Sequence, residues 1–168
     1  MKTFRFVLIV LLTLSLSTVA MAQDGDPIVD DEFGVTVSPP SAWDVLTDDD
    51  GAVANFKHDE SQSQIQVIAT PLMNDEVADV FFDTFHSTLA ESDFSEVSRE
   101  EESIGGFEGT SVTYEFTHSG VTLAIKVFEF MHDDTAWLTI GYMEDAESEE
   151  NSDAYFSVIE NLSFENGE

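Results

Sequence analysis

The segment from Phe107 to Met143 constrains the fold more than any other part of the chain, because two short turns divide it into three alternating runs. A two-residue turn at Ser119-Gly120 pairs apolar residues on one face of a hairpin: Val112 with Val127, Tyr114 with Ile125, and Phe116 with Leu123. A second turn at Asp133-Asp134 extends that face, with Val127 opposite Ile140 and Ile125 opposite Tyr142. A slip of one residue would move every side chain to the other face, so both turns favour one register. The segment therefore predicts a three-stranded antiparallel meander.

The opposite face of this meander gathers large aromatic side chains. The same register sets Phe130 beside Trp137 and Phe128 beside Thr139. We call Phe128, Phe130 and Trp137 the aromatic triad. Two interpretations are open: the triad is an interaction patch for a partner protein or a small apolar ligand, or it is buried under a helix, most simply the C-terminal one. We favour burial, and both faces of the meander supply apolar residues on which a helix can pack.

Shorter patterns on both sides of the meander predict the remaining elements. Alternating apolar residues predict strands at 33–37, 52–57, 64–70 and, more weakly, 94–104. Residues 74–92 carry apolar side chains at intervals of three and four, which predicts an amphipathic helix capped by Asn74. Residues 152–161 predict a second helix, and 162–164 a short final strand. The fold class is α+β: an antiparallel sheet of about six to seven strands with helices packed on its faces.

The charge balance excludes several classes of function. The chain has 35 Asp and Glu residues against 5 Lys and Arg residues, for a formal net charge of −30. Such a charge repels phosphate backbones, so we expect no nucleic-acid partner, and anionic membrane surfaces are disfavoured. A hydrophobic fraction of 42% with 14 Phe is too high for a disordered acidic tail. The absence of cysteine excludes disulfides, thiol catalysis and thiolate metal sites.

The N-terminus has the features of a secretory signal. Lys2 and Arg5 precede an apolar core at residues 6–16, and Ala20-Met21-Ala22 is an A-x-A site, which predicts cleavage between Ala22 and Gln23. The apolar run is short for a membrane span, so a cleaved signal is favoured over a stable anchor. We expect an exported protein, periplasmic or extracellular.

The domain plan follows from these patterns. Residues 1–22 are the cleaved signal peptide, and residues 23–32 are expected to be a flexible acidic leader. Residues 33–166 form a single α+β domain, because the chain shows neither an internal repeat nor a linker long enough to separate two domains.

The order of these elements resembles the PsbP-like superfamily, which includes the photosystem extrinsic protein PsbP, the yeast Ran-binding Mog protein and the bacterial DcrB group. The resemblance covers nearly all of the mature chain and is carried by Phe33 to Val37, Pro39-Pro40-Ser41-Ala42-Trp43, the helix from Asn74, Trp137 to Tyr142, and Ser163-Phe164. Ala42 stands where the family often has Gly. The resemblance implies an α/β/α sandwich in binding or assembly factors without a shared catalytic site, so no functional residue is carried over. A photosystem role is not implied.

Metal sites are not expected from the residue spacing. Asp48-Asp49-Asp50-Gly51 suggests an EF-hand loop, but Leu46 and Lys57 stand where that loop needs acidic ligands. A weak calcium contact near Asp48, Asp49 and Asp50 is left open beside the favoured solvated turn. The four histidines, His58, His86, His118 and His132, show no local metal-ligand spacing and read as surface or hydrogen-bonded residues.

Catalytic motifs are also missing from the sequence. There is no G-x-S-x-G elbow, and the Gly105–Gly109 run lacks the Lys that a phosphate loop needs. We therefore expect no catalytic residue and no cofactor. The favoured function is an exported, highly acidic binding or assembly module without catalytic activity. The alternatives are a carboxylate-based enzyme of unspecified substrate and a salt-adapted structural surface protein.

Overall fold

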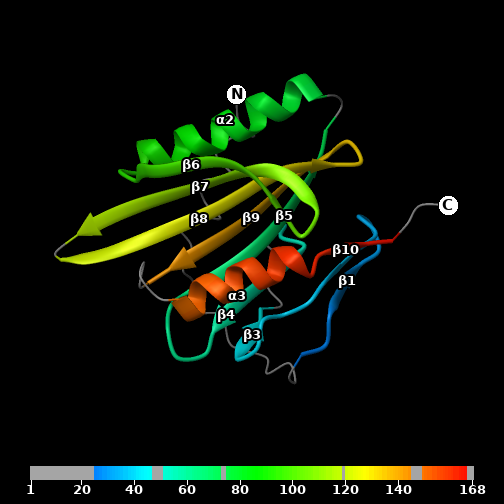
Figure 1. Cartoon of the computed structure of the whole chain (residues 1–168), viewed down its shortest axis with the longest axis horizontal. Helices are drawn as coiled ribbons and strands as arrows, with labels where there is room; N and C mark the ends of the chain where they lie inside the picture. The colour runs from blue at the N-terminus through cyan, green and yellow to red at the C-terminus, as the bar shows by residue number, and fades with distance from the viewer. Residues whose placement is uncertain (1–24, 47–50, 73–74, 119, 145–148, 166–168) are drawn as a thin grey trace.

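In a computed structural model, which describes residues 25–46, 51–72, 75–118, 120–144 and 149–165, one large sheet lies between two helices (Figure 1). The sheet is antiparallel and has seven strands, in spatial order β3 (Trp43–Val45), β4 (Ala54–His58), β5 (Gln64–Pro71), β9 (Thr135–Met143), β8 (Val121–His132), β7 (Phe107–His118) and β6 (Ser95–Ile104). Helix α2 (Asp75–Glu91) covers one face, and helix α3 (Glu149–Glu160) covers part of the other. A small antiparallel sheet of β1 (Ile28–Asp30), β2 (Val35–Val37) and β10 (Ser163–Phe164) lies on the α3 side. The predicted α+β fold class is confirmed.

The predicted register of the meander is confirmed. Strand β7 pairs with β8 so that Val112 lies opposite Val127, and β8 pairs with β9 so that Val127 lies opposite Ile140. Asp133 and Asp134 form the second turn, and both adopt the left-handed conformation, with φ of 46° and 57°. Aspartate tolerates this conformation better than most residues with a Cβ atom, which suits a two-residue hairpin turn. Ser119 of the first turn lies outside the described residues.

Helix α2 buries its apolar stripe on one face of the sheet. Phe85 and Leu89 pack with Val112, Val127 and Ile140 in the α2-side core. The three- and four-residue spacing of the apolar positions places them on one side of the helix, and the polar side faces water. The predicted cap, Asn74, is outside the described part of the chain.

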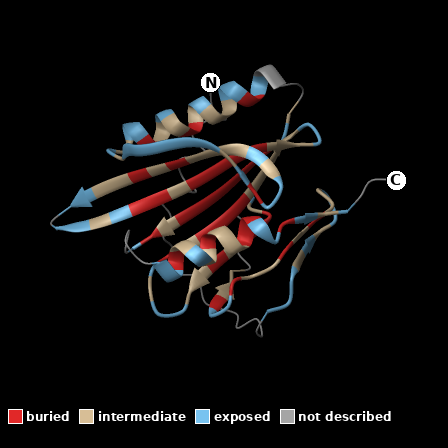
Figure 2. Ribbon diagram, viewed as in Figure 1, coloured by how far each residue is buried: buried red, intermediate tan, exposed pale blue. Residues whose placement is uncertain are grey.

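The aromatic triad forms the centre of the opposite core. Phe128 is 0% exposed, Phe130 is 2% and Trp137 is 1%. The Trp137 ring lies 5.0 Å from the ring of Phe164 and 5.7 Å from that of Phe33, measured between centroids. Both neighbours belong to the small sheet or to the turn beside it, so the cover over the triad consists of α3 and the small sheet together (Figure 2).

The N-terminal part of the domain begins earlier than expected. Residues 23–32 were expected to be a flexible leader, but Ile28–Asp30 forms β1 and pairs with β2, with Ile28 opposite Val37. Ile28 packs against the α3-side core, and the Asp30 carboxylate accepts hydrogen bonds from the backbone N–H of Glu32 at 2.9 Å and of Phe33 at 3.1 Å. The acidic composition of the leader concealed this short apolar strand.

Strand β3 was also missed in the sequence. It begins at Trp43, directly after Ala42, whose φ is 66°. An alanine in the left-handed conformation carries a steric cost of about 1–2 kcal/mol. The position where the PsbP-like family often has glycine is thus one where the backbone favours glycine.

No helix in the described part of the chain is long and apolar enough to cross a membrane. The predicted signal peptide and its cleavage site between Ala22 and Gln23 fall outside the described residues.

Replacing the central indole tests the burial of the triad. Trp137→Ala should lower the free energy of unfolding by about 3–5 kcal/mol, because the surrounding rings cannot close the cavity. Val121→Ala is the control: Val121 is 56% exposed at the start of β8, and its loss should change stability by less than about 0.5 kcal/mol. Urea unfolding measures both variants. Equal midpoints for Trp137→Ala and the wild type would contradict a buried triad.

Candidate functional site

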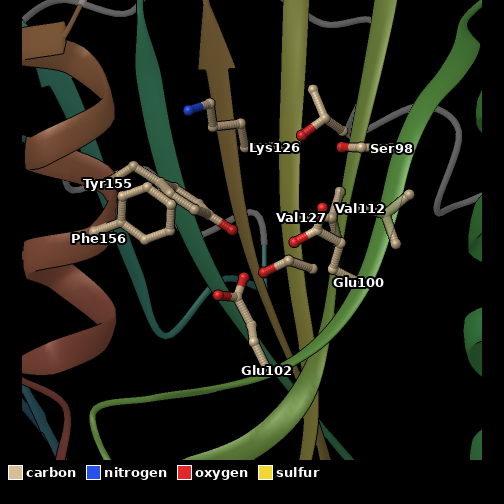
Figure 3. A pocket seen from close by; sticks show the side chains of 10 residues that line it. Ser98, Glu100, Glu102, Val112, Lys126, Val127, Tyr155 and Phe156 are labelled. Carbon is tan, nitrogen blue, oxygen red and sulfur yellow. The ribbon is translucent and has the colours of Figure 1, made fainter.

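A groove of about 250 Å³ lies between α3 and strands β6, β7 and β8 (Figure 3). Its polar lining comes from four elements: Ser98, Glu100 and Glu102 of β6, Ser111 and Thr113 of β7, Lys126 of β8, and Tyr155 of α3. The lining residues from the strands share one face of the sheet, because side chains in a strand alternate and opposed residues in a sheet point the same way. The pairs Ser98 with Thr113, Glu100 with Ser111, and Thr113 with Lys126 bring them side by side. The face of the sheet on which α3 packs is therefore polar towards β6 and aromatic under the helix.

The positively and negatively charged side chains of the groove lie on different walls. Lys126 points towards α3, where its Nζ donates a hydrogen bond to Ser152 Oγ at 2.6 Å and lies 5.4 Å from the centre of the Phe156 ring (Figure 3). Burial lowers the pKa of Lys126, an effect that the nearby Asp153 carboxylate opposes. Glu100 and Glu102 project from β6, and in the part of the chain that the structure describes neither carboxylate lies within ion-pair distance of a basic group.

Tyr155 forms one wall of the groove and is fixed in place by a glycine. Its hydroxyl donates a hydrogen bond to the backbone carbonyl of Thr139 at 3.1 Å. A Cβ atom at Gly141 would lie 2.7 Å from Cδ2 of the Tyr155 ring, so only glycine admits the ring at this depth. Burial, together with the negative charge of Glu102, raises the pKa of Tyr155 well above its ordinary value. The wall is therefore closely packed and uncharged at neutral pH.

One hydroxyl in the lining has no hydrogen-bond partner among the described residues. Ser111 Oγ is buried and unpaired, although buried hydroxyl groups in folded proteins are nearly always hydrogen-bonded. Ser111 lies between Glu100 of β6 and Phe128 of β8, where the polar and the aromatic halves of this face meet.

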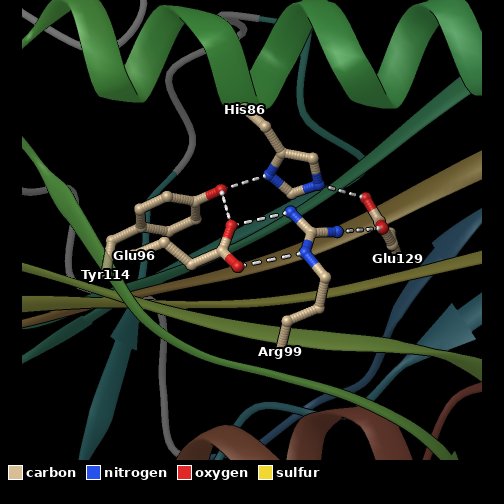
Figure 4. A network of polar contacts seen from close by, with 5 residues as sticks. All are labelled: His86, Glu96, Arg99, Tyr114 and Glu129. Atoms are coloured by element: carbon tan, nitrogen blue, oxygen red, sulfur yellow. Dashed lines mark hydrogen bonds and ion pairs between the residues drawn. The ribbon is translucent and has the colours of Figure 1, made fainter.

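A second polar cluster lies under α2 and consists of His86, Glu96, Arg99, Tyr114 and Glu129, which we call the His86 network (Figure 4). Glu129 is 8% exposed among apolar neighbours, and a buried carboxylate is stable only when it is paired. His86 Nε2 donates to Glu129 Oε2 at 2.7 Å, and Arg99 lies 3.5 Å from the other carboxylate oxygen. The Tyr114 hydroxyl is hydrogen-bonded to His86 Nδ1 at 2.7 Å and lies 3.4 Å from Glu96 Oε2. These contacts connect α2 to three strands.

Arg99 completes the network at the surface. Its guanidinium donates to both carboxylate oxygens of Glu96, at 2.9 and 3.2 Å. The hydrogen bonds from Arg99 lower the pKa of Glu96 despite a smaller opposing effect of burial. Arg99, the single basic residue of β6, therefore already forms ion pairs with carboxylates of its own domain.

The His86 network has the order of an acid–base relay, carboxylate to imidazole to hydroxyl, but the hydroxyl at its end is buried. Tyr114 is 2% exposed, and burial raises the pKa of its hydroxyl to about 12. A reacting group must come within hydrogen-bond distance of the atom that takes or gives the proton. In this arrangement the network stabilises the packing of α2.

From the sequence we expected His86 to be a surface or a hydrogen-bonded residue, and in the structure it is hydrogen-bonded. The signal that was missed is Glu129, which occupies an apolar position of the alternating pattern in β8. The aromatic triad does lie together, and its burial favours the core interpretation. Among the residues that the structure describes, no group of three or more His, Asp or Glu side chains is placed to hold a metal ion. Asp48, Asp49 and Asp50 are outside that part.

Comparisons with known proteins identify the fold. No family model and no curated protein matches this chain. The solution structure of cyanobacterial PsbP (CyanoP) from Synechocystis sp. PCC 6803 is similar, with a TM-score of 0.63 and 10% identity over 90% of this chain and 99% of CyanoP. LpqN of Mycobacterium tuberculosis, a protein involved in cell envelope biogenesis, aligns with a TM-score of 0.56 and 14% identity over 83% of this chain and 90% of LpqN.

A crystal structure from Bacteroides thetaiotaomicron is also similar, with a TM-score of 0.59 and 15% identity. The match covers 85% of this chain but 49% of the other, so this chain spans about half the length of that protein. At these identities the similarity extends to the fold: the chain has a PsbP-like fold.

The three tyrosines provide a test of this packing through pH. Burial raises the pKa of Tyr114, Tyr142 and Tyr155, and these are all the tyrosines in the chain. Because the folded-state values are raised, the stability that these groups contribute is present below about pH 10 and is lost as the pH rises through the folded-state values. An ultraviolet titration of tyrosinate should stay flat near pH 10 in the folded protein, whereas the urea-unfolded chain titrates there. Half-ionisation of even one tyrosine near pH 10 in the folded state would contradict the structure.

Proposed function

We propose that this chain is an exported, non-catalytic module that binds a partner protein on the β6 side of its sheet, using the groove between α3 and β6. The observation that carries the proposal is the groove itself: a polar hollow at the border of a face that is otherwise packed with aromatic side chains. The hydroxyl of Tyr114 in the His86 network is buried, so that cluster lends no support to the carboxylate enzyme that the sequence left open.

Export is supported by two independent features. The first 22 residues have the charge, apolar core and A-x-A site of a secretory signal. A protein of similar fold, LpqN, is involved in cell envelope biogenesis, and an envelope role would suit a chain that leaves the cytoplasm.

The charges favour a polar partner over the small apolar ligand that the aromatic triad suggested. Glu100 and Glu102 lie on one wall with no ion-pair partner among the described residues, and Lys126 is hydrogen-bonded on the other wall. Charged groups at the rim of an interface steer association and exclude wrong partners more than they add affinity. We expect the partner to present cationic groups towards β6.

Paired charge removal tests this proposal. Glu100→Gln/Glu102→Gln takes two charges from the groove, and Asp79→Asn/Asp83→Asn takes two from exposed positions on α2 as the matched control. We expect the groove variant to retain its partner about tenfold more weakly than the wild type, which corresponds to about 1.4 kcal/mol. The measurement is quantitative pull-down of immobilised mature chain from its native envelope fraction or medium at native salt.

Melting temperatures within a few degrees of the wild type verify that both variants are folded. Equal retention by the groove variant and the control would contradict the proposed binding side.

A further inference from the structure

Strand β6 leaves one side of its backbone open. It is the last strand of the seven-stranded sheet, at the end opposite β3, and it pairs with β7 on its inner side (Figure 1). No described strand pairs with its outer side. The register shifts once, between Glu96 and Ser98, and then continues without a break from Ser98 to Ile104. An unpaired strand edge presents a row of N–H and C=O groups that can accept another strand.

The edge is accessible to a partner. Residues 95–101 are exposed, and β6 forms a continuous exposed band beside the buried interior of the sheet (Figure 2). At its far end the turn after β6 is held against α3: a Cβ atom at Gly105 would lie 2.8 Å from the carbonyl oxygen of Ile159, so the backbones approach closely there. The strand is therefore fixed at one end against α3 and open along its outer side.

The charges on β6 decide which strand can be added. Glu100, Glu101 and Glu102 follow one another, and Arg99 is occupied by Glu96 and Glu129. A second copy of β6 would place carboxylates opposite carboxylates, and like charges directly opposed across strands are destabilising. Pairing of two copies is thus disfavoured, whereas a strand carrying Lys or Arg gains attraction on both faces.

We propose that β6 receives an extended, basic segment of a partner protein by strand addition, a refinement that rests on the proposed function. Alternate side chains of the added strand lie on the α3 side, beside Glu100 and Glu102 at the groove. The intervening side chains lie on the α2 side, beside Glu101. In this mode of recognition the backbone hydrogen bonds supply affinity, and alternating side chains supply specificity.

Three synthetic peptides separate strand addition from simple charge attraction. The first alternates Lys with Val. The second has the same sequence but carries N-methyl groups on every second residue, which remove the hydrogen bonds of one edge and keep the charge. The third replaces Lys by Glu. The full mature chain is titrated with each peptide at native salt, and amide hydrogen exchange locates the contact.

We expect the Lys-Val peptide to slow exchange of β6 amides and to bind at least about tenfold more tightly than its N-methylated form, because several backbone hydrogen bonds are lost together. The Glu-Val peptide should not bind. Glu100→Gln/Glu102→Gln should weaken the Lys-Val peptide roughly three- to tenfold, and Asp79→Asn/Asp83→Asn should leave it unchanged.

Equal binding of the methylated and unmethylated peptides, or protection elsewhere than β6, would overturn strand addition. The proposed function is tested separately: it fails if the Glu100→Gln/Glu102→Gln variant retains the native partner as well as the Asp79→Asn/Asp83→Asn control does, whatever the peptides do.

Discussion

The fold depends on the pairing of β8 with β9, because these two strands supply both hydrophobic cores at once. Val127 and Ile140 enter the core under α2, while Phe128 and Trp137 enter the core under α3 and the small sheet. A slip of one residue would move both sets to the wrong face. The protein has no disulfide, so this two-sided burial is the main support of the domain.

Burial decreases from the centre of the sheet towards β6, and the polar features follow that gradient. Strand β9 is buried along nearly its whole length, β7 is half-buried, and β6 is exposed over most of its residues. Where the cover ends, polar groups replace apolar ones: Glu129 is paired by His86 on the α2 face, and Lys126 is held by Ser152 on the α3 face. The groove and the open strand edge both lie where the helices and the small sheet no longer cover the large sheet.

The sequence predicted the local pairing well and the distant packing poorly. The meander register was predictable because short turns and alternating apolar residues encode it within one continuous segment. The small sheet was not, because β1 and β10 are short strands from opposite ends of the chain that meet on β2, and acidic neighbours surround Ile28. The family resemblance did mark Ala42, whose left-handed backbone explains why glycine is common at that position.

The candidate site was harder to predict from the sequence than the fold. The groove depends on how far α3 reaches across the sheet, which no local pattern encodes. The His86 network joins residues from a helix and three strands, and the one signal that the sequence offered, Glu129 at an apolar position of β8, was missed. The aromatic triad was visible in the sequence, but its cover comes partly from the small sheet, whose assembly from distant strands was not predicted.

Native-state amide hydrogen exchange of the free protein tests most directly the claim that the sheet is closed at its centre and open at β6. Amides of β8 and β9 should exchange only through global unfolding, the slowest process available to a domain. In β6 the amides bonded to β7 should be protected, and those facing outwards should exchange at rates close to those of an unfolded chain. Uniform protection along β6, equal to that of β8, would mean that its edge is covered and would contradict this account.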